Sequence, residues 1–371
     1  MKHHNLASSI AVLWCASFGA AAENQSPAPA PAQVTATPLK PVSTARISQR
    51  GNVTGWVPPT QCDQDANVYF LLAPHATPGE VEEAARSGRD LPLNPREVLR
   101  IDADGKNTTR FDPAASPKLM GAKTVKTLGI AVDAHGTVYT LVWATRSAVG
   151  GESDEGVQYI VSFNEKGEYR SQVEVDWREI LVHQFEVFGS GQFLLRGRRT
   201  HTPETRLAIL SGDGSSLRDV VGWSGHPTEP LDGALGPNTP RFNQMVRGED
   251  GRIYVAQEGQ DDVVVYAFGP IGDTEAVLKI QPMPRNRQLL GFRSAGNRFA
   301  AMYLEAGEQP DGLNGERSGR VWIAVYSNVD EGGPHSVYGP APALPTCYQH
   351  TESGDRFTFL VDGEQLITMS P

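Results

Sequence analysis

Residues 129–141 read Gly-Ile-Ala-Val-Asp-Ala-His-Gly-Thr-Val-Tyr-Thr-Leu, and the fold can be predicted from this stretch. Ile130 and Val132 alternate with small residues, which is typical of a half-buried strand. Ala134-His135-Gly136 has the composition of a tight turn. The β-branched and aromatic residues that follow favour a second strand, so the stretch predicts a β-hairpin.

The same strand–turn–strand pattern recurs along the chain, which indicates a repeat architecture. The second strand of each unit can be anchored on one large apolar residue: Val68, Val138, Phe193, Ile253, Phe299 and Phe357. Successive anchors lie roughly 45 to 70 residues apart, a spacing that suits four-stranded blades with inserted loops. The abundance of turn residues, 38 Gly and 27 Pro, agrees with many short strands.

The sixth unit offers three strands before residue 371, whereas a blade needs four. We predict that residues 45–56 supply the fourth strand, because ring closure removes an open sheet edge. The chain is therefore predicted to be all-β, a six-bladed β-propeller over residues 45–371 whose last blade is completed by an N-terminal strand.

The residues before this domain predict export. A basic start, an apolar run over residues 6–18 and a small-residue end are typical of a secretory signal peptide, here residues 1–22. Residues 23–44 are rich in Pro and Ala, and we expect a disordered linker. No later stretch is apolar enough for a transmembrane helix, so we expect no integral membrane segment after removal of the signal. The predicted location is the periplasm or the extracellular space, and we expect a monomer.

Two cysteines, Cys62 and Cys347, follow the predicted signal peptide. An even cysteine count in an oxidising compartment favours a disulfide. The two residues lie near opposite ends of the folded region, and the first and last units of a closed ring are neighbours. We therefore predict a Cys62–Cys347 disulfide at the closure, with two unpaired buried thiols as the alternative.

The pattern Gly129–Asp133 followed by Gly136–Tyr139 resembles the NHL-type and TolB-like six-bladed β-propeller repeats, and Met245–Val255 is a looser copy. The sequence after Tyr139 lacks the Asp-x-x-Asn-x-Arg-Ile continuation of the usual repeat. The resemblance therefore implies the fold at the level of the repeat. Propellers host hydrolases, lyases, receptors and scaffolds, so the function has to be argued from a site.

The long connections of the predicted blades fall on one face, and long loops on a rigid scaffold are where function concentrates. We predict a ligand site on this long-loop face, around the mouth of the central channel. An arginine there could hold a carboxylate through two parallel hydrogen bonds. The candidate ligand-binding residues are His183, Gln184, Glu186, Trp223, His226, Arg241, Asn243, Arg285 and Arg287. The alternative is that these residues serve loops and turns.

The formal net charge is −10 and no basic run is present, so nucleic acid is not an expected partner. We predict a binding module for an unknown small molecule or protein, with no catalytic residue, metal ligand or cofactor assigned. The alternative is a metal-dependent hydrolase, because propeller lactonases of similar architecture hold a metal with Glu, Asn and Asp from inner strands, here Glu186, Asn243 and Asp133. Asp133 also suits a turn cap, and a structural scaffold is a third hypothesis.

Overall fold

In this computed structural model, the described part of the chain belongs to one compact unit, Thr35–Pro371. The described residues are 36–47, 56–72, 79, 86, 96–146, 155–199, 205–220, 245–258, 263–280, 287–306, 319–327, 333–361 and 365–371. The predicted signal peptide and most of the predicted linker lie outside these ranges. Among the described residues, no helix is long and apolar enough to cross a membrane.

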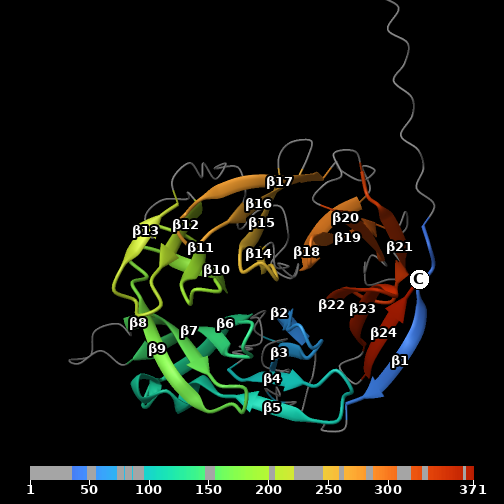
Figure 1. Cartoon of the computed structure of the whole chain (residues 1–371). Coiled ribbons are helices and arrows are strands. Elements are labelled where there is room, and N and C mark those ends of the chain that lie inside the picture. The colour runs from blue at the N-terminus through green and yellow to red at the C-terminus, as the bar shows by residue number, and fades with distance from the viewer. Residues whose placement is uncertain are drawn as a thin grey trace, which may run out of the picture. The chain divides into compact units, whose positions relative to one another are not determined.

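The described residues form six four-stranded antiparallel sheets, arranged as the blades of a ring (Figure 1). In the first three blades the strands follow one another in chain order. Blade 1 contains β2 (Trp56–Cys62), β3 (Val68–Leu72), β4 (Val98–Ile101) and β5 (Thr108–Phe111); two short 3-10 helices, η1 (Pro113–Ala115) and η2 (Pro117–Leu119), follow it. Blade 2 contains β6 (Thr124–Val132), β7 (Val138–Arg146), β8 (Glu155–Phe163) and β9 (Tyr169–Val175), and blade 3 contains β10 (Leu181–Val187), β11 (Phe193–Arg198), β12 (Thr205–Leu210) and β13 (Leu217–Asp219).

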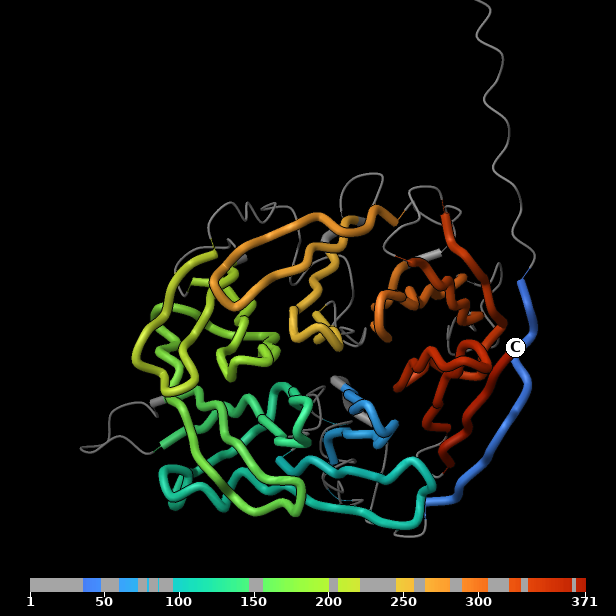
Figure 2. Tube along the Cα trace, in the orientation of Figure 1, coloured from blue at the N-terminus to red at the C-terminus, as the bar shows by residue number. Residues whose placement is uncertain are grey.

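Blades 4 and 5 repeat this order, whereas blade 6 combines the two ends of the described chain. Blade 4 contains β14 (Met245–Arg247), β15 (Ile253–Glu258), β16 (Val263–Phe268) and β17 (Thr274–Ile280), and blade 5 contains β18 (Arg287–Ala295), β19 (Arg298–Ala306), β20 (Gly319–Ser327) and β21 (Ser336–Ala341). Blade 6 contains β22 (Pro345–Thr351), β23 (Gly354–Val361), β24 (Gln365–Ser370) and β1 (Lys40–Arg46). The first strand of each blade lies nearest the centre of the ring (Figure 2). The predicted six-bladed fold is confirmed.

The N-terminal strand closes the ring as predicted, but it begins earlier in the chain. β1 pairs antiparallel with β24, from Lys40 opposite Ser370 to Arg46 opposite Gln365. The closing strand is therefore not residues 45–56, and Trp56 instead begins β2 in blade 1. β1 is almost wholly exposed, and an outer edge strand needs no apolar pattern and tolerates proline. This is why residues 40–44 read as linker in the sequence.

The hydrophobic core is divided among the interfaces between blades. The described residues form six buried clusters, and each cluster joins two neighbouring blades. The cluster between blades 6 and 1 contains Ile47, Val68, Phe70 and Cys347, so the residue that follows β1 also packs at the closure. Because each apolar strand face is covered by the next blade, the ring is stabilised around its whole circumference.

The hairpin turns are built as the sequence predicts. Asp133 Oδ1 accepts hydrogen bonds from backbone amides of its own turn, including that of Thr137 at 2.9 Å, and Tyr139 Oη donates to Asp133 Oδ2 at 3.3 Å. In blade 1, Tyr69 Oη donates to Asp63 Oδ2 at 2.8 Å in the same way. The turn role predicted for Asp133 is therefore confirmed. In these two blades, an Asp after the inner strand holds a Tyr from the second strand.

Candidate functional site

A cavity of about 300 Å³ lies at the C-terminal ends of the inner strands, beside the short turns that lead to the second strand of each blade. Strand ends or turns from all six blades line it. Its polar lining residues are Gln61, Cys62, Asp63, Gln64, Asp133, Glu186, Arg247, Glu249, Arg293, Ser294, Tyr348, Gln349, His350 and Thr351. This end of the central channel is opposite to the long-loop face favoured by the sequence.

Glu186 on β10 is the buried acid of this cavity, with 2% of its surface exposed. Its Oε2 accepts a hydrogen bond from Gln61 Nε2 at 3.2 Å, and its Oε1 accepts one from the amide of Val187 at 3.1 Å. Burial raises the pKa of Glu186 to about 8, although these hydrogen bonds and the charges of Arg247 and Arg293 oppose the rise. Glu186 therefore carries a proton over much of the neutral range when the cavity is empty.

Gln61 connects three blades at the same place. It lies near the end of β2 in blade 1 and is 9% exposed. Its Nε2 donates to the carbonyl of Ile130 in blade 2 at 3.3 Å and to Glu186 in blade 3. A single buried amide thus fixes the relative positions of three inner strands, which is the geometry that a preorganised site requires.

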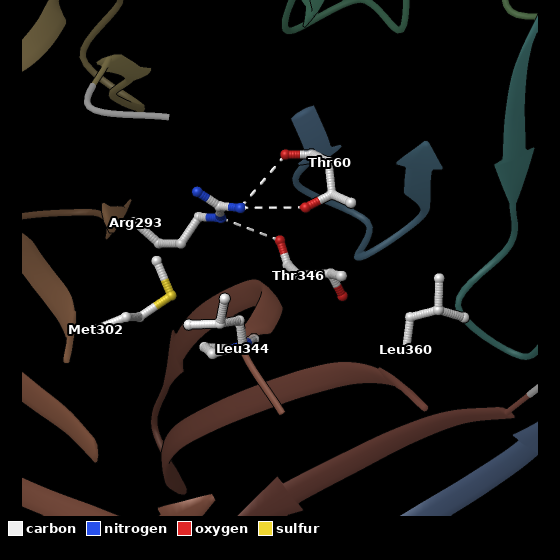
Figure 3. Close-up of a pocket in the computed structure, with 7 residues that line it drawn as sticks. Thr60, Arg293, Met302, Leu344, Thr346 and Leu360 are labelled. Carbon is white, nitrogen blue, oxygen red and sulfur yellow. Dashed lines mark hydrogen bonds between the residues drawn. The ribbon is translucent and has the colours of Figure 1, made fainter. Parts of the chain in front are cut away.

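Arg293 on β18 connects the inner strand of blade 5 to those of blades 1 and 6 (Figure 3). Its Nε donates to the carbonyl of Thr346 in blade 6 at 3.1 Å, and its Nη2 donates to the carbonyl and hydroxyl oxygens of Thr60 in blade 1, both at 3.3 Å. A second cavity of about 10 Å³ lies beside the guanidinium, close to the space of one water molecule. Arg293 is buried, and backbone oxygens rather than a carboxylate are its main partners.

Arg247 ends β14 in blade 4 and also lines the larger cavity. Its Nε is buried and has no hydrogen-bond partner among the described residues. The positive charge of Arg247 lowers the pKa of Glu186, and the described residues show no ion pair between the two side chains. The backbone carbonyl of Arg247 accepts a hydrogen bond from Ser294 Oγ at 3.0 Å, which connects blades 4 and 5.

A second polar cluster lies beside the cavity between blades 5 and 6. Asp355 is 3% exposed and accepts hydrogen bonds from Tyr338 Oη at 2.7 Å and Tyr348 Oη at 3.0 Å. His350 Nδ1 lies 2.8 Å from the same carboxylate, and Arg298 is 4.0 Å away. Tyr348 and His350 line the cavity, so Asp355 orients part of its wall.

Cys62 and Cys347 are free thiols in this structure, in contact across the junction of blades 1 and 6. The hydrogen bond from the Cys347 thiol, assisted by the charge of Arg293, lowers the pKa of Cys62 against the effect of burial. Burial raises the pKa of Cys347. The two cysteines are therefore neighbours at the ring closure, as the sequence analysis expects, and the disulfide itself stays a prediction.

The structure brings few of the predicted ligand-binding residues together. Glu186 lines the cavity, whereas His183 and Gln184 lie earlier on β10 and do not. Gln184 Oε1 instead lies 3.5 Å from Arg196 Nη1. Arg287 is described only as the first residue of β18. Trp223, His226, Arg241, Asn243 and Arg285 lie outside the described residues.

Gln61, Arg247 and Arg293 line the cavity but are not among the residues predicted from the sequence. Each is a polar residue near the end of an inner strand, one to a few positions before the turn. Gln61, Glu186 and Arg293 occupy equivalent positions, because each lies opposite the residue after the anchor of its second strand. Arg247 lies one position later, opposite the anchor Ile253, so comparing a single position across the units would have missed it. The signal is weak in any single unit, because one polar residue beside a turn is ordinary.

The donor set of the hydrolase alternative does not form a cation site in the described part of the chain. Both oxygens of Glu186 accept hydrogen bonds, and Asp133 holds its turn. Asn243, the third expected ligand, lies outside the described residues. The described residues also contain no group of three or more His, Cys, Asp or Glu that could hold a metal ion.

The ring of six sheets makes this chain a six-bladed β-propeller. No family model matches the chain, and no curated protein matches it by sequence. A protein of unknown function from Dyadobacter fermentans DSM 18053 is 10% identical, with a TM-score of 0.48 over 89% of this chain and 98% of that one. The structure of the Dos1 propeller is 9% identical, with a TM-score of 0.42 over 90% of this chain and 95% of that one. At such identities the likeness concerns the fold and carries no argument about a ligand.

Proposed function

We propose that this protein is an exported binding module that holds a small polar molecule in the central cavity, at the short-turn end of the ring. The observation that carries the proposal is the pair Glu186 and Arg247. Both line one cavity, and neither makes an ion pair with any described residue. Buried or half-buried ionisable groups are ordinarily paired, so two that face a common cavity favour a polar ligand between them.

The surroundings of the cavity support the same function. Gln61 and Arg293 join the inner strands by buried hydrogen bonds, so the walls are held in position before any ligand arrives. A volume of about 300 Å³ is at the lower end of the range for small-molecule sites. The proposal that the protein is exported, to the periplasm or outside the cell, depends on the signal peptide predicted at residues 1–22.

A thermal-shift screen with a panel of small polar metabolites tests this function. Ala134 is an exposed turn residue on the cavity wall, so Ala134→Trp should obstruct the cavity without disturbing the core. The matched control is Ala103→Trp, because Ala103 is exposed and occupies the same place in the related turn Asp102-Ala103-Asp104-Gly105, away from the cavity. We expect at least one compound of the panel to raise the melting temperature of the wild type and of the control, but not that of Ala134→Trp. A panel that stabilises none of the three proteins, or all three equally, would contradict a central small-molecule site.

A further inference from the structure

We propose that the ligand of the central cavity is an α-amino acid, with its ammonium group against Glu186 and its carboxylate against Arg247. This inference rests on the proposed binding function and adds the chemical class of the ligand. The geometry behind it is the juxtaposition of one acid and one guanidinium from neighbouring blades in a single cavity.

Glu186 and Arg247 come from the inner strands of blades 3 and 4, which are neighbours in the ring. The backbone contact from the amide of Gly189 to the carbonyl of Gly251, at 3.4 Å, joins the turns that follow these two strands. The two side chains therefore line the cavity from adjacent strand ends, and the described residues show no ion pair between them. A small ligand that carries a positive and a negative group a few bonds apart is the kind of molecule that would bridge them.

An α-amino acid has this arrangement, because its ammonium and carboxylate groups are attached to one carbon atom. A guanidinium binds a carboxylate through two parallel hydrogen bonds, and the buried Nε of Arg247 lacks a partner among the described residues. Each oxygen of Glu186 accepts one hydrogen bond, which leaves each oxygen able to accept another from an ammonium group.

Other polar and charged groups surround the pair. Gln61 from β2 donates to Glu186, and Arg293 from β18 is held by Thr60 and Thr346. The remaining charged or titratable lining residues are Asp63, Asp133, Glu249 and His350, and both oxygens of Asp133 accept hydrogen bonds within its own turn. The cavity volume of about 300 Å³ is at the lower end of the range for small-molecule sites, which suits a ligand of this small size.

Release of the Glu186 proton on ligand binding provides a second measurement that tests the proposal. Burial raises the pKa of Glu186 to about 8, so the empty site holds a proton at neutral pH. An ammonium group beside this carboxyl favours its ionised form, and the proton then leaves to solvent. Binding at pH 7 should therefore release close to one proton. Calorimetry in buffers of different ionisation enthalpy measures this number directly.

The test is calorimetric titration of the mature protein with the twenty standard L-amino acids. Each amino acid that binds is then compared with its N-acetyl derivative, which lacks the ammonium charge, and with its methyl ester, which lacks the carboxylate. We expect each blocked derivative to bind at least about tenfold more weakly. These ligand-side controls do not depend on whether a protein variant folds.

Protein variants locate the site. Arg247→Met should weaken amino-acid binding at least about tenfold, and Glu186→Gln should weaken it and abolish the proton release. The control is Arg110→Met, because Arg110 lies on the outermost strand of blade 1 and its side chain is half exposed. Amino-acid binding that both site variants retain unchanged would overturn this placement.

The remaining outcomes distinguish a failure of the amino-acid inference from a failure of the proposed binding function. Neutral sugars, monocarboxylic acids and simple amines are titrated in parallel. One of these compounds could bind to the wild type but not to Ala134→Trp, while no amino acid binds. In that case the amino-acid inference fails and the binding function stands. If no compound of any class binds, both the inference and the proposed small-molecule function fail.

Discussion

At the residue scale, buried polar side chains connect the blades near the ring centre. Arg293 donates to oxygen atoms in blades 1 and 6, and Gln61 joins blades 1, 2 and 3. Gln158 Nε2 donates to the carbonyl of Val182 at 3.0 Å and so adds a contact between blades 2 and 3. The bonds of Gln61 and Arg293 lie beside the cavities, whereas the bond of Gln158 reaches Val182 within the apolar cluster between blades 2 and 3.

Replacing Arg293 tests this role. Arg293→Met leaves the buried carbonyls of Thr60 and Thr346 without their donor, and unsatisfied buried acceptors are costly. We expect the free energy of unfolding to fall by about 3 kcal/mol, against a change of about 0.5 kcal/mol or less for the exposed control Arg110→Met. Urea denaturation of both variants measures the difference. Equal stability of the two variants would show that the buried arginine does not tie the blades together.

Glu186 predicts a specific dependence of stability on pH. Its carboxyl has a pKa of about 8 in the folded protein, against an ordinary value of 4.5 in the unfolded chain. The folded state thus binds the extra proton, and the stabilisation is fully present below pH 4.5 and is lost as pH rises through 8. The wild type should lose a few kcal/mol over this interval relative to Glu186→Gln, on the order of 1.4 kcal/mol for each pH unit that separates the two pKa values. Denaturation at several pH values that gave parallel curves for both proteins would contradict the raised pKa.

At the element scale, β1 shows why a closing strand is difficult to recognise in a sequence. Its seven residues are nearly all exposed and include Pro41, so its pairing with β24 depends on backbone hydrogen bonds rather than on an apolar face. Hydrophobic patterning reports which side chains are buried, and an outer strand buries few. The second strands carry strong patterns, and each predicted anchor, from Val68 to Phe357, lies in the second strand of its blade.

Two truncations test the corrected boundary. Removing residues 23–46 from the mature chain deletes β1 and exposes the edge of β24, so we expect the melting temperature to fall by at least about 5 °C. Removing residues 23–35 leaves β1 complete and should leave the melting temperature unchanged. Differential scanning calorimetry compares both with the full mature chain. An equal effect of the two truncations would mean that β1 contributes nothing to the closure.

At the scale of the whole molecule, blade 6 joins residues from both ends of the propeller. The cluster between blades 6 and 1 contains Ile47, Leu366 and Cys347, with Cys62 packed against it. The contact between the two thiols lies beside this cluster and beside Arg293. Packing, strand pairing and the cysteine pair therefore act at one junction, which is the place where a ring can open.

Oxidation of the cysteine pair should stabilise this junction. We expect peptide mapping of the exported, non-reduced protein to find Cys62 joined to Cys347. The loop between them is long, and the chain-entropy treatment assigns such a crosslink about 5 kcal/mol as an upper bound. Reduction should therefore lower the melting temperature, and Cys62→Ser with Cys347→Ser should show no response to reductant. Two alkylatable thiols in the exported protein would exclude the disulfide.

The repeat, the all-β class and the turn role of Asp133 could be read from the chain, because strand and turn preferences act between residues close in sequence. The position of the cavity could not be predicted from the sequence. Glu186 was a candidate, but Gln61, Arg247 and Arg293 come from three other blades, and only the closed ring brings the four around one cavity. Whether the channel is hollow at the short turns depends on how side chains from six blades fill a shared centre. No local pattern records that packing, so only the tertiary structure shows the cavity at the short turns.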